Sequence, residues 1–382
     1  MSLLDKNIKN FALRVFYFFS PLILPVLFLL GLGVYSGELW PISYVLDYEY
    51  SHPRNILFLK EYFSGSDRNA KYQEMLKRNP EVLMIGSSRT LTFREEMFGS
   101  ADFYNAGRLV QNYQDLLDFL EHVFPKINPK IIYFGVDWYL LGDRTYSHET
   151  KIDPSMSDDV YNWRAEMYFF RRFLGDLIKD PSLISRIIYR QLDMVSGKIP
   201  IGIRAFYGDG IRFDGSMQFG TILKRRRDNP VYVDAVTPTV LDQVRGGLSY
   251  FKFDNQVSQN RIDTIKKFLQ NAKERNIQVV GFSSPYSAEV YRELTTSPFY
   301  KEFFAASRKK ISEIFEEAGM PYFDFHDLAS LGIDDQYMLD GAHMGDTASA
   351  ILIRAMVSDL DLHAYLDEKI NQKTTTSLEI IW

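Results

Sequence analysis

The sequence predicts an α/β fold, a three-layer α/β/α sandwich around a parallel sheet of about five strands, preceded by one transmembrane helix. Three observations support this prediction. Short apolar runs alternate with amphipathic helical runs at the spacing of βαβ units. Polar turns containing glycine or serine follow several of the apolar runs, at the sheet edge where open α/β sheets bind ligands. Residues 15–35 form an uncharged segment that is long enough to cross a bilayer core.

Composition excludes several classes of protein. The 382 residues are 46% hydrophobic and 24% charged, as in globular proteins. The net charge of −5 and the lack of a nucleic-acid motif argue against a nucleic-acid partner. The chain has no cysteine, so disulfides and thiolate catalysis are excluded. We expect neither a cofactor nor a metal site.

The uncharged segment predicts an anchor in the cell membrane. Basic residues come before it and acidic residues after it, which places a short N-terminal stub in the cytoplasm and the rest outside the membrane. The segment exceeds the roughly 7–15 apolar residues of a secretory signal, which favours an uncleaved single-pass anchor. Small residues near position 35 leave cleavage as the alternative. We assign residues 1–37 to the stub and anchor, and 38–80 to a membrane-proximal linker.

Residues 81–86 form the first predicted strand of the main domain, and Gly86-Ser87-Ser88-Arg89 follows its apolar run. Glycine permits a tight strand-to-helix turn. A serine at that turn lies at the carboxyl edge of the sheet, beside backbone N–H groups. Ser87 or Ser88 therefore either caps the following helix or acts as a nucleophile.

Asp340 and His343 favour the nucleophile. A carboxylate three residues before a histidine can orient the imidazole, as general-base catalysis by a Ser-His pair requires. His326 is the alternative histidine, and we expect it to be structural.

The remaining pattern completes the domain over residues 81–360. Apolar runs predict further strands at 102–107, 130–137, 277–282 and 320–325, and periodicity predicts helices at 111–124, 259–275, 300–318 and 348–357.

Residues 144–250 read as an insertion rather than as part of the sheet. It contains two helical runs, a glycine-punctuated hairpin at 208–220 and the basic run 224–227, which is either a solvated loop or a contact for anionic polymer or headgroups. The tail, 361–382, ends in the mainly apolar strip 378–382, which either folds onto the domain or binds a partner.

Ser88 in Gly86-Ser87-Ser88 and the Asp-x-x-His block of Asp340 and His343 resemble the SGNH (GDSL-like) hydrolase superfamily, over roughly residues 80–140 and 258–360. The resemblance implies that Ser88 is the nucleophile, that Asp340 and His343 complete a catalytic triad, and that the N–H groups of Ser88 and Gly107 form an oxyanion hole.

One block departs from that pattern. The family's Gly-x-Asn, whose amide stabilises the oxyanion, is Gly135-Val136-Asp137 here. An ionised aspartate only accepts hydrogen bonds. Asp137 is therefore either a protonated donor or has another task, such as pairing with Arg89, and Asn105 is an alternative third donor. We expect Arg89 to contact substrate.

The anchor makes the chain similar to membrane-bound SGNH proteins of bacterial cell-surface O-acylation, such as lipoteichoic-acid D-alanylation and alginate acetylation. That similarity implies a serine O-acyltransferase that passes an acetyl or D-alanyl type of acyl group to a cell-envelope polysaccharide or teichoic acid. The implied partner is a membrane-bound O-acyltransferase. A carbohydrate or lipid esterase and a non-catalytic scaffold protein are the alternatives.

Overall fold

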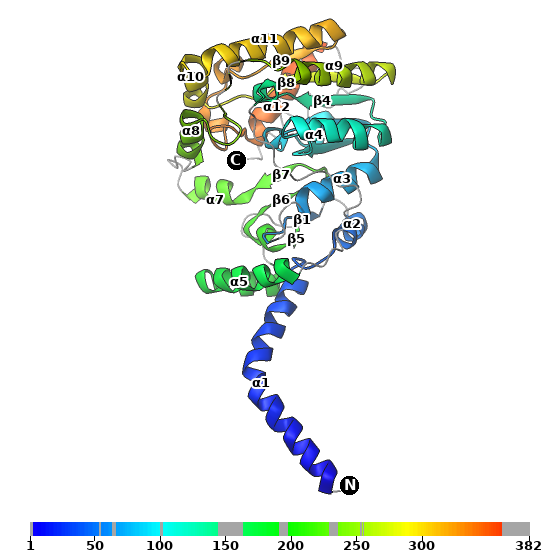
Figure 1. Ribbon diagram of the computed structural model, residues 1–382, viewed down its shortest axis with the longest axis vertical. Coiled ribbons are helices and arrows are strands. Elements are labelled where there is room, and N and C mark those ends of the chain that lie inside the picture. The colour runs from blue at the N-terminus through cyan, green and yellow to red at the C-terminus, as the bar shows by residue number, and fades with distance from the viewer. Residues whose placement is uncertain are drawn as a thin grey trace. The chain divides into compact units, whose positions relative to one another are not determined.

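The computed structural model describes residues 3–52, 55–62, 66–99, 102–143, 163–190, 198–228, 236–252, 254 and 256–360. It is an α/β protein with parallel strands (Figure 1). The chain divides into two compact units. Unit 1 comprises Met1–Ser66 and Asp158–Gly210, and unit 2 comprises Asp67–Ser157 and Ile211–Trp382. Most of the segment expected as a linker thus shares a unit with part of the expected insertion.

Unit 2 is built on a five-stranded parallel sheet with the strand order β3-β2-β4-β8-β9. Its strands are β2 (Val82–Gly86), β3 (Phe103–Gly107), β4 (Ile131–Gly135), β8 (Gln278–Ser283) and β9 (Tyr322–Asp324). All five lie where apolar runs predicted them. In β2, β3, β4 and β8 the reason is that a strand buried on both faces needs a continuous apolar sequence, whereas β9, at the edge of the sheet, is only partly buried.

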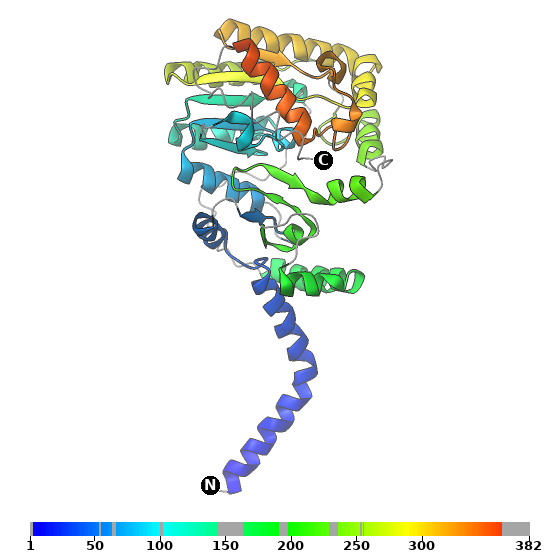
Figure 2. The ribbon, with the colours of Figure 1, turned by 180° about the vertical axis from the view of Figure 1, so that it is seen from behind.

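Helices cover both faces of this sheet, and alternating strand residues supply a core to each face. Leu83 and Ile85 face one core, with α3 (Ser66–Arg78), α4 (Tyr113–Asp118), α9 (Gln259–Glu274) and α11 (Lys301–Ala318). Val82 and Met84 face the other, which includes α12 (Asp346–Leu360) and the short helix η2 (Glu95–Phe98). Figure 2 shows α12, in orange-red, in front of the sheet.

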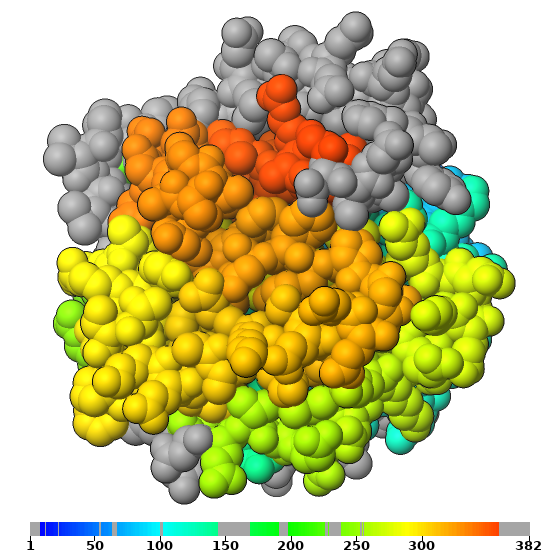
Figure 3. Space-filling view, turned by 90° about the horizontal axis from the view of Figure 1, so that it is seen from above, coloured from blue at the N-terminus to red at the C-terminus, as the bar shows by residue number. Residues whose placement is uncertain are grey.

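One predicted helical region of unit 2 differs in the structure. The helix expected over residues 111–124 begins as α4 but widens into a π-helical segment, η3 (Phe119–Val123), and ends in a 3-10 turn, η4 (Phe124–Lys126). Pro125 has no N–H group, so an α-helical ladder cannot continue through it. Helix α10 (Ala288–Thr296) was not predicted. Figure 3 looks onto a side of unit 2 where α9, α10 and α11 form a continuous surface.

Unit 2 also contains η1 (Ser88–Thr90), η5 (Trp138–Leu141), β7 (Met217–Phe219), α7 (Gly220–Asp228), α8 (Val236–Gly246), η7 (Leu328–Leu331) and η8 (Asp335–Tyr337). The predicted hairpin has its turn where Arg212 N–H donates to the Ser216 carbonyl at 2.8 Å. It joins β6 (Asp209–Ile211), at the boundary of the units, to β7. The basic run 224–227 belongs to α7 rather than to a loop.

Unit 1 contains α1 (Leu3–Tyr35), α2 (Ile42–Ser51), α5 (Trp163–Lys179), α6 (Ser182–Tyr189) and η6 (Ile203–Tyr207). Its strands β1 (Ile56–Phe58) and β5 (Ile199–Ile201) pair in parallel, so the expected insertion does contribute sheet. In the described chain no single helix meets the length and apolarity of a membrane span. The segments Ile8–Pro21 and Ile23–Tyr35 meet them only as a pair, with a 59° bend between them. The tail 361–382 lies outside the described residues.

Candidate active site

Ser88 lies immediately beyond the carboxyl end of β2 because Gly86 turns the chain there. Gly86 has φ +150°, and a Cβ atom on it would lie 2.7 Å from the Thr90 methyl group and 3.0 Å from the Gly135 carbonyl oxygen. Only glycine fits this conformation and this space. The Ser87 hydroxyl accepts a hydrogen bond from Arg89 N–H at 3.3 Å, so Ser87 caps η1 while Ser88 points elsewhere.

Asp340 and His343 lie on the loop between η8 and α12, and the aspartate shapes this loop. Its Oδ1 accepts hydrogen bonds from the N–H groups of Ala342 and His343, each at 2.8 Å. The loop is closed by Leu339 N–H, which donates to the His343 carbonyl at 2.8 Å. The histidine is therefore held by its own backbone as well as by its ring.

The three predicted residues meet in one hydrogen-bonded chain. Ser88 Oγ lies 2.8 Å from His343 Nε2, and His343 Nδ1 lies 2.9 and 2.8 Å from the two carboxylate oxygens of Asp340. Ser88 is partly exposed, and the side chains of His343 and Asp340 are 29% and 9% exposed. A substrate can thus reach the hydroxyl and the outer imidazole nitrogen, while the carboxylate is shielded from water.

The charge on Asp340 is favoured by its partners. Burial on its own raises the pKa of this carboxyl group. The interaction with His343 and the two backbone N–H groups outweigh burial, and the pKa is lowered. An ionised Asp340 accepts from Nδ1–H, which leaves Nε2 free to accept the Ser88 proton, the arrangement of a general base.

The oxyanion donors differ from the prediction. Gly107 N–H donates to Asn105 Oδ1 at 2.8 Å, and Asn105 Nδ2 donates to the carbonyls of Thr90 and Phe93, both at 2.8 Å. Asn105 is fully buried, so its prediction as an oxyanion donor is wrong, and the Gly107 N–H is already engaged. Ser88 N–H, at the first position of η1, has no partner within that turn.

The Arg89 side chain is buried, so the prediction that it contacts substrate is wrong as well. The side chain is 4% exposed and pairs with Asp137 Oδ1 at 2.5 Å. Asp137 Oδ2 accepts from Tyr139 OH at 2.7 Å. Asp137 is therefore an acceptor and not an oxyanion donor, and the alternative that it pairs with Arg89 is confirmed.

Arg89 also joins three loops at the carboxyl edge of the sheet. Its Nε donates to the Ala342 carbonyl at 3.1 Å, and its Nη2 donates to the carbonyls of Ser284 and Pro285. The guanidinium carbon lies 3.7 Å from the ring centre of Tyr286. The residue beside the serine thus holds the loop that carries the histidine. Only the Arg89–Asp137 pair had been anticipated, because the other partners are backbone carbonyls in distant loops.

His326 lies apart from this hydrogen-bonded chain. Its Nδ1 is 2.6 Å from Asp324 Oδ1, and the ring is fully buried between Tyr286 and Phe304. The expectation of a structural role agrees with this burial, since a substrate cannot reach the ring.

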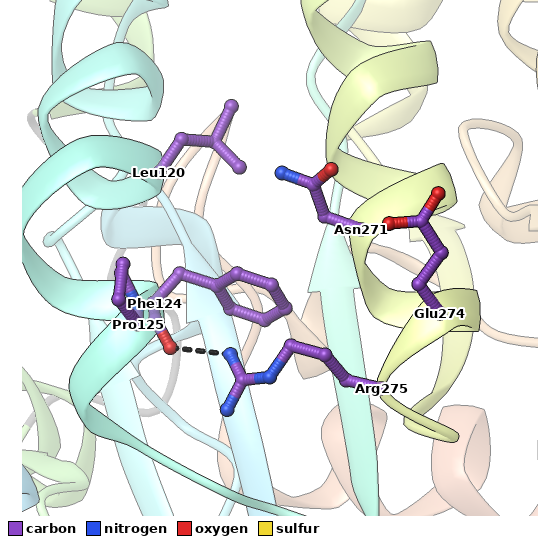
Figure 4. Close-up of a pocket in the computed structure, with 6 residues that line it drawn as sticks. All are labelled: Leu120, Phe124, Pro125, Asn271, Glu274 and Arg275. Atoms are coloured by element: carbon purple, nitrogen blue, oxygen red, sulfur yellow. Dashed lines mark hydrogen bonds between the residues drawn. The ribbon is translucent and has the colours of Figure 1, made fainter.

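A pocket of about 320 Å³ lies at the other edge of the sheet (Figure 4). Leu120, Phe124 and Pro125 line it from η3 and η4, and Asn271, Glu274 and Arg275 line it from the end of α9. These segments lead into the amino ends of β4 and β8, whereas Ser88 follows the carboxyl end of β2. The pocket is therefore separate from the triad.

Among the described residues, no group of three or more His, Asp or Glu side chains is arranged to hold a metal ion. No protein-family model matches the chain, and no curated protein matches it.

Proposed function

We propose that the protein is a serine-dependent O-acyltransferase that forms an acyl-Ser88 intermediate. The observation that carries this proposal is the chain of short contacts from Ser88 Oγ through His343 to Asp340. A serine in contact with an imidazole, itself oriented by a carboxylate, is the general arrangement of an activated nucleophile.

In the first half-reaction, His343 Nε2 takes the Ser88 proton as Oγ bonds to the carbonyl carbon of an acyl ester or thioester. The tetrahedral intermediate carries its negative charge beside Ser88 N–H. The bond to the leaving group then breaks, and Nε2 returns the proton to that group. Asp340 stabilises the imidazolium throughout.

In the second half-reaction a hydroxyl group of a cell-envelope polymer gives its proton to Nε2 and attacks the acyl carbon. Collapse of the second intermediate releases the acylated polymer, and Ser88 regains the proton. Water in place of the hydroxyl group would make the protein a carbohydrate or lipid esterase.

The oxyanion site has few free donors, which predicts slow reaction with unactivated esters whether the acceptor is a hydroxyl group or water. Gly107 N–H and the Asn105 amide are engaged within the protein, and Asp137 accepts rather than donates. Loss of a single oxyanion donor lowers kcat by about 10²–10³-fold in a serine protease. A weak oxyanion site suits a protein that receives an activated acyl group, and it is also the feature expected of a non-catalytic scaffold.

The setting of the reaction is part of the proposal. The charge pattern around the N-terminal apolar segment supports an anchor in the cell membrane, with the residues after about Gly37 outside it. The resemblance to surface O-acylation proteins supports a membrane-bound O-acyltransferase as the source of the acyl group and a polysaccharide or teichoic acid as its acceptor.

Acyl trapping tests the proposal. The full chain is incubated with p-nitrophenyl acetate, the acetyl group on Ser88 is quantified by mass spectrometry, and its decay is followed with and without alginate or teichoic acid. An acyl-Ser88 that decays faster with polymer supports transfer. Equal rates of decay with and without polymer favour the esterase. No acylation of Ser88 in any condition favours the scaffold.

A further inference from the structure

Large exposed apolar side chains are concentrated in unit 1. Among the described residues, unit 2 exposes only Leu248 and Phe299 of this type. The others lie on α1, α2, α5 and α6. Scattered exposed apolar residues are normal, but a grouped set marks an interaction surface.

Helix α5 has two apolar sides. Phe169, Phe173 and Leu177 repeat every four residues and are buried in the core of unit 1. Leu174 and Ile178 are also four residues apart but are exposed, Ile178 by 71%. A helix that only covered its own core would be polar on this second side.

Helix α6 repeats this arrangement beside the end of α1. Leu183 and Ile187 are buried, whereas Ile188 and Tyr189 are exposed, Tyr189 by 71%. Tyr35 OH, in the last turn of α1, donates to the Ile188 carbonyl at 3.3 Å. The exposed apolar side of α6 is therefore continuous with the exposed apolar surface of α1.

Cationic side chains accompany this surface. Arg171 and Arg172 are exposed on α5. Arg190, after α6, donates to the Tyr35 carbonyl at 3.1 Å and lies 4.9 Å from the ring centre of Tyr35. The acidic residues nearby have partners within unit 1, since Asp176 accepts from Tyr62 OH and Asp180 pairs with Arg186. The surface thus combines apolar side chains with positive charge.

We propose that Leu174, Ile178, Ile188 and Tyr189, named here the α5–α6 face, rest in the headgroup region of the bilayer that α1 enters. Amphipathic helices with basic residues bind at that depth, with the apolar side about 5–10 Å into the boundary between headgroups and acyl chains. Anionic lipid adds attraction for the basic residues. Figure 1 shows α5 crossing the end of α1, as a helix lying in the membrane plane would. The proposal rests on the predicted anchor and not on the acyl-transfer chemistry.

The absence of cysteine makes a direct test straightforward. Ile178→Cys and Ile188→Cys are each labelled with an environment-sensitive fluorophore in the full chain and reconstituted into vesicles of phosphatidylcholine and phosphatidylglycerol. Lys179→Cys is the matched control, because it is the next residue of α5 and points about 100° away. Lys267→Cys on α9 is an exposed control in unit 2.

We expect blue-shifted emission at positions 178 and 188, and at least twofold stronger quenching there by lipids spin-labelled near the headgroup than at 179 or 267. Water-like emission at 178 and 188 would overturn the proposal. Blue-shifted emission without lipid quenching would also overturn it, since a protein would then cover the face. A Ser88→Ala background should give the same result, so failure of the catalytic proposal leaves this test unaffected.

Discussion

Two adjacent serines at the end of β2 have different roles in the structure. Ser88 contacts His343, whereas Ser87 accepts a hydrogen bond from the backbone of Arg89. We predict that Ser88→Ala lowers acyl transfer by at least about 10⁴-fold without unfolding the protein, the scale seen when a triad nucleophile is removed. Ser87→Ala should cost only the stability of a cap, about 1 kcal/mol. Acyl-transfer rates of the two purified variants check this. A large loss in Ser87→Ala with little loss in Ser88→Ala would assign the nucleophile to Ser87.

The buried pair of Arg89 and Asp137 leads to a prediction about stability. Removing one charge leaves the other buried without its partner, which costs about 3–5 kcal/mol. Arg89→Met and Asp137→Asn should each lower the free energy of unfolding by about that amount, with activity lost as the His343 loop loosens. The double variant should lose less than the sum, because no unpaired charge remains. Urea unfolding measures all three, and strictly additive losses would contradict the pairing.

The arrangement around Arg89 marks the limit of what the sequence could predict at this scale. Ser88, Asp340 and His343 could be found because serine after a strand and Asp-x-x-His are local patterns. The contacts of Arg89 with three loops depend on how those loops meet, and no local spacing encodes that. The engagement of Asn105 with two carbonyls depends likewise on the turn around Thr90 and Phe93.

At the scale of elements, the junction of β2 and η1 depends on Gly86. A methyl group there would meet Thr90 and the Gly135 carbonyl, besides the strain of a positive φ. Displacement of a reacting group by about 1 Å can cost about 10²-fold in rate. Gly86→Ala should therefore reduce activity by roughly that factor, measured as the acyl-transfer rate.

Gly319→Ala is the control for this prediction. Gly319 also has a positive φ, +70°, but has open space around its Cα, and it ends α11 away from the triad. Its substitution should cost stability alone, about 1 kcal/mol. Equal loss of activity in both variants would show that backbone strain, and not the packing at the β2 turn, is responsible.

The junction after α1 contains a buried carboxyl group, Glu38. It accepts hydrogen bonds from the N–H groups of Tyr62 and Ile203 at 2.9 and 2.7 Å. Burial, the largest influence, raises its pKa from 4.5 to about 7 against those hydrogen bonds. The folded state therefore binds the proton more tightly than the unfolded state, and this contribution to stability is complete below pH 4.5 and is lost as the pH rises towards 7.

Glu38→Gln tests that dependence, because the amide keeps an acceptor and cannot ionise. The thermal midpoint of the full chain in detergent should fall more steeply from pH 4.5 to 7 in the wild type than in Glu38→Gln. Parallel pH profiles would show that Glu38 does not titrate in this range.

Most elements of the five-stranded sheet of unit 2 and of its covering helices could be predicted. Continuous apolar runs indicate buried parallel strands, and helical periodicity indicates covering helices. The region after residue 118 could not be predicted, since a π-helical segment leaves no clear periodic signal. Strand β5 was missed because three residues containing a proline, Ile199–Ile201, form a strand only through pairing with β1.

At the scale of the whole molecule, the division into two units was beyond sequence reasoning. Unit 1 joins residues before 67 to residues after 157, and the contacts between β1 and β5 and in the shared core bring them together. Such pairing across more than 100 residues has no local signature. The apolar helix α1 nonetheless lies where the uncharged segment 15–35 predicted a helix.

The central claim is that Ser88 is the nucleophile of a working Ser-His-Asp triad. Reaction of the full chain with a fluorophosphonate, followed by mass spectrometry of the intact protein and its peptides, tests it most directly. The structure predicts one adduct, on Ser88, that is absent in Ser88→Ala and forms at least about 10³-fold more slowly in His343→Ala. An unlabelled wild type, or an adduct that persists in Ser88→Ala, would contradict the claim.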